Sequence, residues 1–148
     1  MSNEIEPIIA YIDGACKGNP GIGGWGVYFK YKDNSKELFG GSKYTTNNIM
    51  ELTSAIEALS YFNNKCKIEI ITDSEYLRKG ITEWIKKWEI NNWKNSRKEN
   101  IKNKELWIKL NELNKKHIVE WKWVKSHSGN VGNEKADELA NKGCLSIK

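Results

Sequence analysis

The order of strand-like and helix-like segments restricts the fold of this chain more than any other feature of its sequence. Apolar patterns predict three strands first, at about residues 8–13, 24–32 and 36–42, forming an antiparallel meander. The later segments are a helix at about 47–62, a strand at 67–72, helical residues 74–91 broken by Gly80, a helix at 103–114, a strand at 117–124 and a helix at 132–142. This order predicts an α/β fold with a mixed sheet and helices on its faces.

Turns are expected between the first three strands. The glycine-rich stretch 14–24 is predicted to turn the chain, and its glycines would let the backbone approach a ligand closely. It is not a dinucleotide-binding fingerprint, because these glycines do not open a helix. Asp33, Asn34 and Ser35 predict a tight turn before the third strand.

The composition predicts one domain spanning residues 1–148, long enough for a substantial core. Apolar residues make up 39% of the chain, and no apolar run approaches membrane-spanning length. The N-terminus lacks the basic and hydrophobic regions of a secretory signal. Cys16, Cys66 and Cys144 are an odd number without CxxC spacing. We therefore expect a monomeric cytoplasmic protein with free thiols, no membrane association and no zinc site.

Four acidic residues, Asp13, Glu51, Asp73 and Asp137, occupy positions where a charge is unusual. Asp13 and Asp73 each end an apolar run, and ligand sites gather at the carboxyl ends of strands in open α/β sheets. Glu51 and Asp137 lie early in two predicted helices. Carboxylates gathered in one place repel each other unless cations lie between them. Because few His or Cys residues accompany these four, they suit Mg²⁺ or Mn²⁺ better than zinc.

Each of these acidic residues also has a purely structural interpretation. Asp13 precedes a glycine and could form a turn, Asp73 could cap a helix, and Asp137 suits the first turn of a helix. Glu51 could be the back-bonding partner of Asn48 in a capping box. Alternatively, Glu51 shares its helix face with small apolar residues, and a cation would then offset the cost of its burial. The sequence leaves these two roles of Glu51 open.

The positive charge of the chain is concentrated in one segment. The formal net charge is +5 and the pI is near 9.0. Residues 86–104 alone carry seven basic and two acidic side chains, a net charge of +5. Because Trp88 and Trp93 lie among these basic residues, the segment is typical of a footprint for a phosphate backbone. A solvated, lysine-rich surface is the alternative.

Taken together, four stretches resemble the type 1 ribonuclease H family over nearly the whole chain. They are YIDGACKGNPGIGGWG, TTNNIMELTSAIEAL, ITDSEYLRKGITEWIKKW and WKWVKSHSGNVGNEKADELA, and their order, spacing and residue types fit at once. The resemblance implies an endoribonuclease that cuts the RNA strand of RNA/DNA hybrids with two divalent ions, physiologically Mg²⁺, leaving 5′-phosphate and 3′-hydroxyl ends. It also implies the ribonuclease H-like fold, a five-stranded mixed sheet of three antiparallel and then two parallel strands flanked by helices.

The resemblance assigns catalytic roles by motif. Asp13 would bridge both ions, and Asp137 would complete the ion that activates the attacking water. Glu51 and Asp73 would hold the ion that stabilises the leaving oxygen. His127 matches a mobile histidine that assists proton transfer or product release, and its imidazole titrates near neutrality. A histidine on a loop is also often a bystander.

The resemblance further implies contacts to both strands of the hybrid. Asn19, Asn47 and Asn48 match residues at the RNA sugar edge, and Glu51 would accept a hydrogen bond from a 2′-hydroxyl. The other matches are the DNA-strand contacts Thr46, Trp84 and Asn103, the minor-groove position Glu75, and the basic protrusion that grips the backbone, with Lys86, Lys87, Trp88, Trp93 and Lys94.

Three positions depart from the family pattern. Glu75 replaces a glutamine, and a carboxylate cannot donate an amide hydrogen bond to the minor groove. Tyr44 replaces an arginine of the DNA-phosphate pocket, which is expected to weaken that grip. The loop 128–132 differs from the commonest family version, which bears on the mobility of His127.

Two other functions are compatible with parts of this pattern. A catalytically silent hybrid-binding module would keep the binding surface, but the four carboxylates and His127 argue against it. A DNA strand-transfer or junction-resolving nuclease would share the fold, but the asparagines matched to the RNA sugar edge argue against it.

Overall fold

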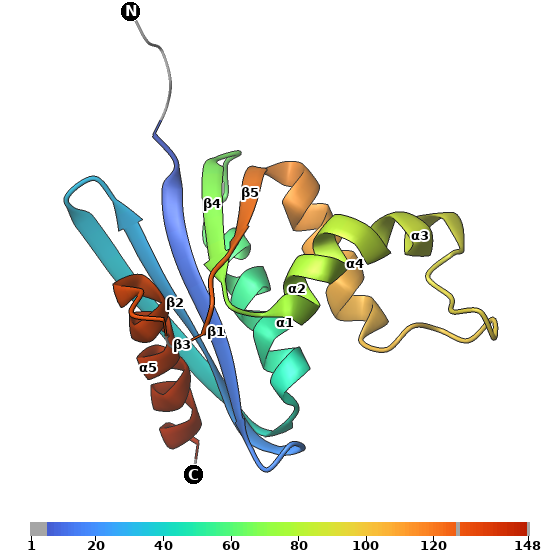
Figure 1. Cartoon of the computed structure of the whole chain (residues 1–148), viewed down its shortest axis with the longest axis horizontal. Coiled ribbons are helices and arrows are strands. Elements are labelled where there is room, and N and C mark those ends of the chain that lie inside the picture. Colours follow the sequence, from blue (N-terminus) through green and yellow to red (C-terminus); the bar gives the residue numbers. More distant parts are fainter. Residues whose placement is uncertain (1–5, 127, 148) are drawn as a thin grey trace, which may run out of the picture.

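A five-stranded mixed sheet forms the centre of the molecule, for which a computed structural model describes residues 6–126 and 128–147 (Figure 1). Its strands are β1 (Ile8–Lys17), β2 (Gly21–Tyr31), β3 (Asn34–Thr45), β4 (Lys67–Thr72) and β5 (Ile118–Trp123). They lie in the order β3-β2-β1-β4-β5. Pairing is antiparallel within β1–β3 and parallel for β1 with β4 and β4 with β5. The predicted sheet of three antiparallel and two parallel strands is therefore confirmed.

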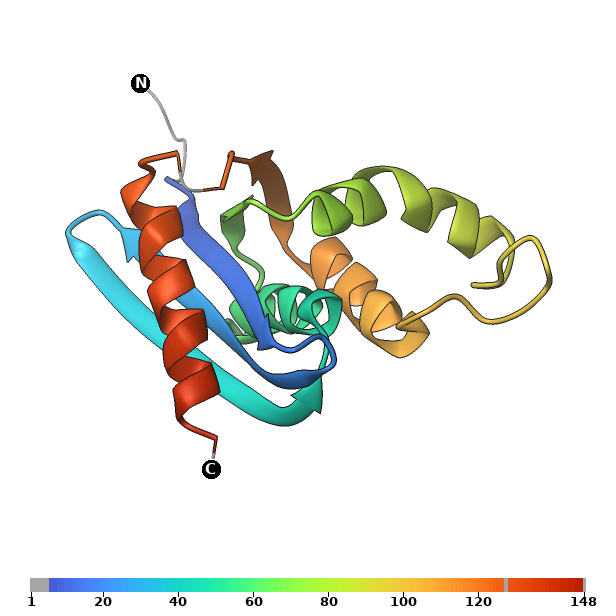
Figure 2. The same ribbon diagram turned by 60° about the horizontal axis from the view of Figure 1, so that its bottom comes forward.

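Helices cover both faces of this sheet (Figure 2). Helix α1 (Asn47–Ser60) packs on one face beside α4 (Lys104–Lys116), and α5 (Val131–Leu145) crosses β1, β2 and β3 on the other. The helical elements α2 (Glu75–Lys79), η1 (Gly80–Trp84) and α3 (Ile85–Ile90) follow one another without interruption. They lead into a loop that projects away from the sheet. Every helix in the described part of the chain is too short or too polar to cross a bilayer.

The main core lies between the sheet and the helices α1 and α4. Leu52, Ile56 and Leu59 of α1 are buried and share one face of the helix. The strands contribute the buried side chains Ala10, Ile12, Val27, Phe29, Ile68 and Ile70. Burial of a large apolar side chain contributes about 1.5–3 kcal/mol, so this cluster supplies much of the stability of the sheet on which the site is built.

The glycine-rich stretch 14–24 does not turn the chain as a whole, and this prediction was wrong. Strand β1 continues to Lys17 and β2 begins at Gly21, so the turn is confined to the residues between them. The glycines of the strands instead leave room for helices. A Cβ on Gly26 would lie 2.6 Å from the carbonyl oxygen of Ala136, so only glycine lets α5 pack this closely on β2.

Gly80 does not break the helical segment, and this prediction was also wrong. Helical structure continues through η1, and a Cβ on Gly80 would overlap the ring of Trp107. Trp107 is fully buried and its ring centroid lies 5.3 Å from that of Trp88, which lies 6.0 Å from Trp93. The glycine therefore serves close packing, and the tryptophans attach the projecting segment to the core.

Candidate active site

Asp13 and Asp73 lie at the same end of the parallel pair formed by β1 and β4. The last paired residues of these strands are Tyr11 and Ile71. Asp73 directly follows β4, as expected. Asp13 was predicted at the end of a strand, and this was wrong, because β1 runs on to Lys17 with Asp13 paired to Gly26 of β2. The parallel pairing of β1 with β4 ends at Tyr11 and Ile71, just before Asp13 and Asp73. The carboxylates of Asp13 and Asp73 therefore still converge.

Glu51 reaches the same place from helix α1. Thr46 caps this helix, with its Oγ1 accepting a hydrogen bond from the Ile49 N–H at 3.2 Å, so Glu51 is not needed as the capping partner of Asn48. The Glu51 residue is only 3% exposed. Its Oε1 is buried and has no hydrogen-bond partner among the described residues. Because an unpaired buried carboxylate oxygen is costly, the structure favours the cation role over the capping box.

Four carboxylates meet around Asp13. One oxygen from each of Asp13, Glu51 and Asp73 lies within 4.8 Å of the other two. Asp137 approaches from α5 and is close enough to the Asp13 carboxyl group to raise its pKa. The strand β1, the end of β4 and the helices α1 and α5 each supply one acidic side chain.

The close packing of these acids raises the pKa of two of them. Burial, followed by the charges of Glu51 and Asp73, raises the pKa of Asp13 to about 10. Burial, followed by the charge of Asp73, raises the pKa of Glu51 to about 7. Each shift reports a carboxylate whose negative charge lacks compensation, which a divalent cation would supply. Strongly perturbed acids of this kind are typical of functional sites.

The Asp73 carboxylate does not cap a helix and is oriented by neighbouring side chains. Ser74, not Asp73, caps α2, accepting from the Leu77 N–H at 3.2 Å. The indole N–H of Trp123 in β5 donates to the Asp73 backbone carbonyl at 3.0 Å. The side-chain amide of Asn133 in α5 donates to Asp73 Oδ2 at 3.4 Å. Sequence reasoning missed both Trp123 and Asn133, although Asn133 precedes Asp137 by one helical turn.

His127 lies outside the described residues, so its assignment as a proton-transfer residue stays a prediction. The residues on either side of it, Ser126 and Ser128, are exposed. Ser128 Oγ donates to the Lys125 carbonyl at 2.6 Å.

The residues predicted to read the RNA strand gather beside the carboxylates. Asn47 and Asn48 open helix α1 one turn before Glu51, and Asn19 lies in the turn between β1 and β2. The Asn19 Oδ1 accepts a hydrogen bond from the Asn47 N–H at 2.9 Å, which ties that turn to the helix. Thr46 is the helix cap described above, so its hydroxyl already has a structural partner.

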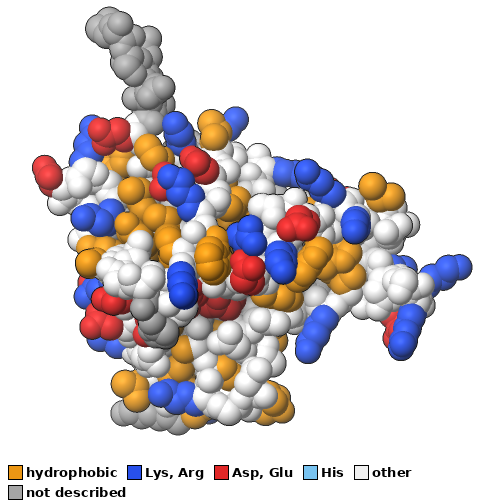
Figure 3. All heavy atoms as spheres, viewed as in Figure 1, with side chains coloured by type: hydrophobic (Ala, Val, Ile, Leu, Met, Phe, Trp, Pro, Cys, Tyr) orange, Lys and Arg blue, Asp and Glu red, His pale blue; other side chains and the backbone are white. Residues whose placement is uncertain are grey.

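The basic segment 86–104 forms the projecting end of the molecule. Lys86, Lys87 and Lys94 are exposed, and Lys and Arg side chains are prominent over this end in the space-filling view (Figure 3). The aromatic residues predicted to contact substrate there, Trp84, Trp88 and Trp93, are half-buried and pack on one another, with centroids 5.9 Å and 6.0 Å apart. The lysines therefore offer the free charge, and the tryptophans hold the segment that carries it.

Two further predicted contacts have defined partners. The side-chain amide of Asn103 donates to the Tyr76 hydroxyl at 3.2 Å. Glu75 is exposed, and its carboxylate pairs with the Arg78 guanidinium at 2.7 Å. The guanidinium in turn lies 6.0 Å from the ring centroid of Trp123, so Glu75 is the outermost member of a chain of contacts that leads back to Asp73.

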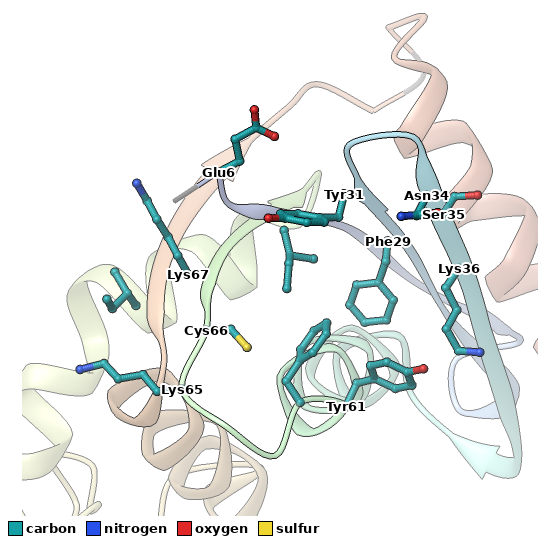
Figure 4. Close-up of a pocket in the computed structure, with 13 residues that line it drawn as sticks. Glu6, Phe29, Tyr31, Asn34, Ser35, Lys36, Tyr61, Lys65, Cys66 and Lys67 are labelled. Carbon is teal, nitrogen blue, oxygen red and sulfur yellow. The ribbon is translucent and has the colours of Figure 1, made fainter. Parts of the chain in front are cut away.

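A separate cavity of about 690 Å³ lies at another part of the sheet (Figure 4). Aromatic and aliphatic side chains line it, including Phe29, Tyr61 and Phe62, together with Lys36 and Lys65. None of the four carboxylates borders it.

Comparison with known proteins gives concordant results from sequence and structure. The sequence model of the RNase H family matches residues 6–145. The ribonuclease H of Francisella tularensis subsp. novicida is 58% identical over 140 residues, which cover 95% of this chain and 92% of that protein.

Two solved structures extend this likeness. The crystal structure of LC9-RNase H1, a type 1 RNase H with the type 2 active-site motif, has a TM-score of 0.84 and 30% identity, and the match covers 99% of this chain and 76% of that one. The structure of LC11-RNase H1 in complex with an RNA/DNA hybrid has a TM-score of 0.71 and 23% identity, with 94% and 97% of the two chains covered, and it shows the shared fold.

Proposed function

The chain belongs to the ribonuclease H family, enzymes that degrade the RNA of RNA/DNA hybrids, and from this premise we propose how it binds and cleaves such a hybrid. The activity proposed is endonucleolytic hydrolysis of the RNA strand with two divalent cations, giving 5′-phosphate and 3′-hydroxyl ends. The observation that carries the proposal is the convergence of Asp13, Glu51 and Asp73, whose oxygens lie within 4.8 Å of one another.

The residues present fit divalent cations. The donors are carboxylate oxygens, one of which, Glu51 Oε1, is buried without a partner among the described residues. Oxygen donors of this kind suit Mg²⁺, with Mn²⁺ as a substitute. Asp13 would contact both cations, since its carboxyl group is the one that Glu51, Asp73 and Asp137 all influence. When bound, the cations would polarise the scissile phosphate and neutralise charge on the attacking and leaving oxygens.

The chain itself supplies a preorganised frame for this chemistry. Asp13 Oδ1 accepts a hydrogen bond from the Gly14 N–H at 2.9 Å, which orients its carboxylate. Asp73 is held through its carbonyl by Trp123 and through Oδ2 by Asn133. Groups fixed in this way need little reorganisation when charge develops in the transition state. His127 is proposed to assist proton transfer or product release.

Substrate recognition is proposed to divide between two surfaces. Asn19, Asn47 and Asn48 would contact the RNA sugar edge beside the carboxylates, with Glu51 accepting from a 2′-hydroxyl. The DNA strand and its phosphates would lie toward Thr46, Trp84 and Asn103 and along the basic segment 86–104. This assignment is supported by the shared position of the asparagines and Glu51 at the start of α1 and by the exposed lysines of α3.

Cleavage of an end-labelled RNA/DNA hybrid tests the proposal. The parent protein is expected to cut only the RNA strand of the hybrid in Mg²⁺, to leave matched RNA/RNA and DNA/DNA duplexes intact, and to stop in EDTA. The Asp13→Asn variant is expected to bind the hybrid without cutting it. Normal cleavage by this variant would contradict the mechanism.

Other outcomes would identify the alternatives. Tight, metal-independent binding of hybrid without turnover by the parent protein would indicate a silent binding module, and cleavage of DNA/DNA would indicate a DNA nuclease. We further propose that the protein acts in the cytoplasm as a monomer. Elution at twice the chain mass in size-exclusion chromatography with light scattering would contradict the monomer.

A further inference from the structure

Asn133 contacts the carboxylate group without being an acid itself. The residue is 4% exposed, and its Nδ2 donates to Asp73 Oδ2 at 3.4 Å. The orientation of this amide follows from chemistry, because the reverse orientation would place two acceptors against each other. The Asn133 Oδ1 is therefore turned away from Asp73 Oδ2, and it is buried with no hydrogen-bond partner among the described residues.

The position of Asn133 on α5 joins two parts of the site. The Asn133 N–H donates to the Oδ1 of Asn130, the cap of α5, at 2.9 Å, so Asn133 lies in the first turn. Asp137 is four residues further along and shares its helix face. The amide of Asn133 thus connects the helix that carries Asp137 with the end of β4 that carries Asp73.

We propose that Asn133 is a positioning residue for the cation site: its Nδ2 orients the Asp73 carboxylate, and its Oδ1 accepts a hydrogen bond from a water of the cation's hydration shell. The inference rests on the proposed function, because it requires a cation at the carboxylates. Mg²⁺ dehydrates reluctantly and keeps several waters when carboxylates bind it, so an unpaired buried acceptor beside the carboxylates has a natural donor. Outer-shell partners of this kind typically change metal affinity about 10- to 100-fold.

A purely structural role is the competing explanation, in which Asn133 only fastens α5 to the sheet. The two roles predict different behaviour for a variant that keeps the shape and loses the hydrogen bonds. Asn133→Leu fills nearly the same space without a donor or an acceptor, whereas Asn133→Ala removes the side chain altogether. If Asn133 only packed, leucine would restore what alanine loses.

The test is Mn²⁺ binding to the substrate-free protein, measured from the free-ion signal in electron paramagnetic resonance. Circular dichroism confirms that each variant is folded. Both Asn133→Ala and Asn133→Leu are expected to bind Mn²⁺ about 10-fold more weakly than the parent. In steady-state cleavage with hybrid, both are expected to lower kcat at limiting Mg²⁺ with an unchanged KM for hybrid. The matched control is Asn141→Ala, which removes a hydrogen bond from Asn141 Nδ2 to the Asp137 carbonyl on the same helix and should leave Mn²⁺ affinity unchanged.

Each outcome has a distinct meaning. Parental Mn²⁺ affinity in both Asn133 variants, or in the leucine variant alone, would overturn the positioning role while leaving the proposed function intact. Absence of Mn²⁺ binding by the parent protein would overturn the cation site of the proposed function and this inference with it.

Discussion

The backbone of Gly14 lies against the backbone of Glu51 so closely that a Cβ at position 14 would be 2.5 Å from the Glu51 amide nitrogen. The same Cβ would be 2.8 Å from Glu51 Oε1, the buried oxygen that has no partner among the described residues. Asp13 on β1 and Glu51 on α1 can share a site only because Gly14, where the strand meets the helix, has no side chain. This contact explains the DG pair of the first motif better than a turn does.

Gly14→Ala is expected to destabilise the protein by about 1–3 kcal/mol, since overpacking forces the backbone of α1 to move. It should also weaken cation binding, because Glu51 moves with the helix. Chemical denaturation in EDTA and a Mn²⁺ titration measure the two effects. Gly80→Ala is the matched control: its Cβ overlaps Trp107, so stability should fall while cation affinity is kept. Equal loss of cation affinity in both variants would contradict the assignment.

The metal-free protein is expected to lose stability between about pH 7 and 8.5. The pKa of Asp13 is about 10 in the folded protein against 3.8 ordinarily, so in this window the folded state keeps a proton that the unfolded state has released. Stability therefore falls as pH rises, by about 1.4 kcal/mol per pH unit for one proton, or about 2 kcal/mol across the window. His117, whose pKa burial lowers from 6.5, opposes this slope only near pH 7, where the unfolded state still binds part of a proton, and adds almost nothing at higher pH.

Thermal denaturation in EDTA measures this pH dependence. The Asp13→Asn variant should show a flatter profile and a higher melting temperature than the parent at pH 8.5, because asparagine is neutral without binding a proton and the cost of keeping Asp13 protonated in the folded state is removed. Saturating Mg²⁺ should remove most of the difference between the two proteins. A parent profile that stays flat in EDTA, or rises with pH, would show that Asp13 does not hold this proton in the folded state.

Glu75→Gln is expected to strengthen hybrid binding. Glutamine can donate a hydrogen bond to the minor groove, and the change removes a negative charge near phosphates, so KM should fall about 2- to 10-fold, the equivalent of one hydrogen bond. Stability should change by less than about 1 kcal/mol, because the ion pair with Arg78 is exposed. Glu75→Ala separates the two effects, since it removes the charge without adding a donor. An equal fall in KM in both variants would contradict the proposed hydrogen bond from the introduced glutamine to the minor groove and attribute the effect to the lost charge.

Replacing Lys86 and Lys87 by alanine is expected to weaken hybrid binding and its dependence on salt. If both side chains lie against phosphates, the slope of log affinity against log salt should decrease in magnitude by about 1.5 to 2. Fluorescence anisotropy with a labelled hybrid in Ca²⁺ or EDTA over a salt series gives this slope. The control pair Lys65→Ala and Lys67→Ala, which lines the separate cavity, should leave it unchanged. Identical slopes for parent and both pairs would place the hybrid elsewhere.

The sequence by itself determined the order of elements and the mixed sheet, and it singled out the acids that are proposed to carry the chemistry. The elements can be predicted because apolar periodicity depends only on residues close together in the sequence. The acids stand out because Asp13, Glu51 and Asp73 lie among apolar residues, where a charge is costly. The sequence could not choose between the capping role and the cation role of Glu51, because that choice depends on contacts between α1 and β1. It also misjudged Gly80 and the glycines of the first strands as breaks.

Only the tertiary structure decided which groups press against one another across elements. Three such contacts join residues that are far apart in the sequence: Gly14 with Glu51, Gly80 with Trp107, and Asn133 with Asp73. A glycine that allows close packing and a glycine that turns the chain look alike in a sequence, because what distinguishes them is the neighbour that the fold brings to the missing Cβ.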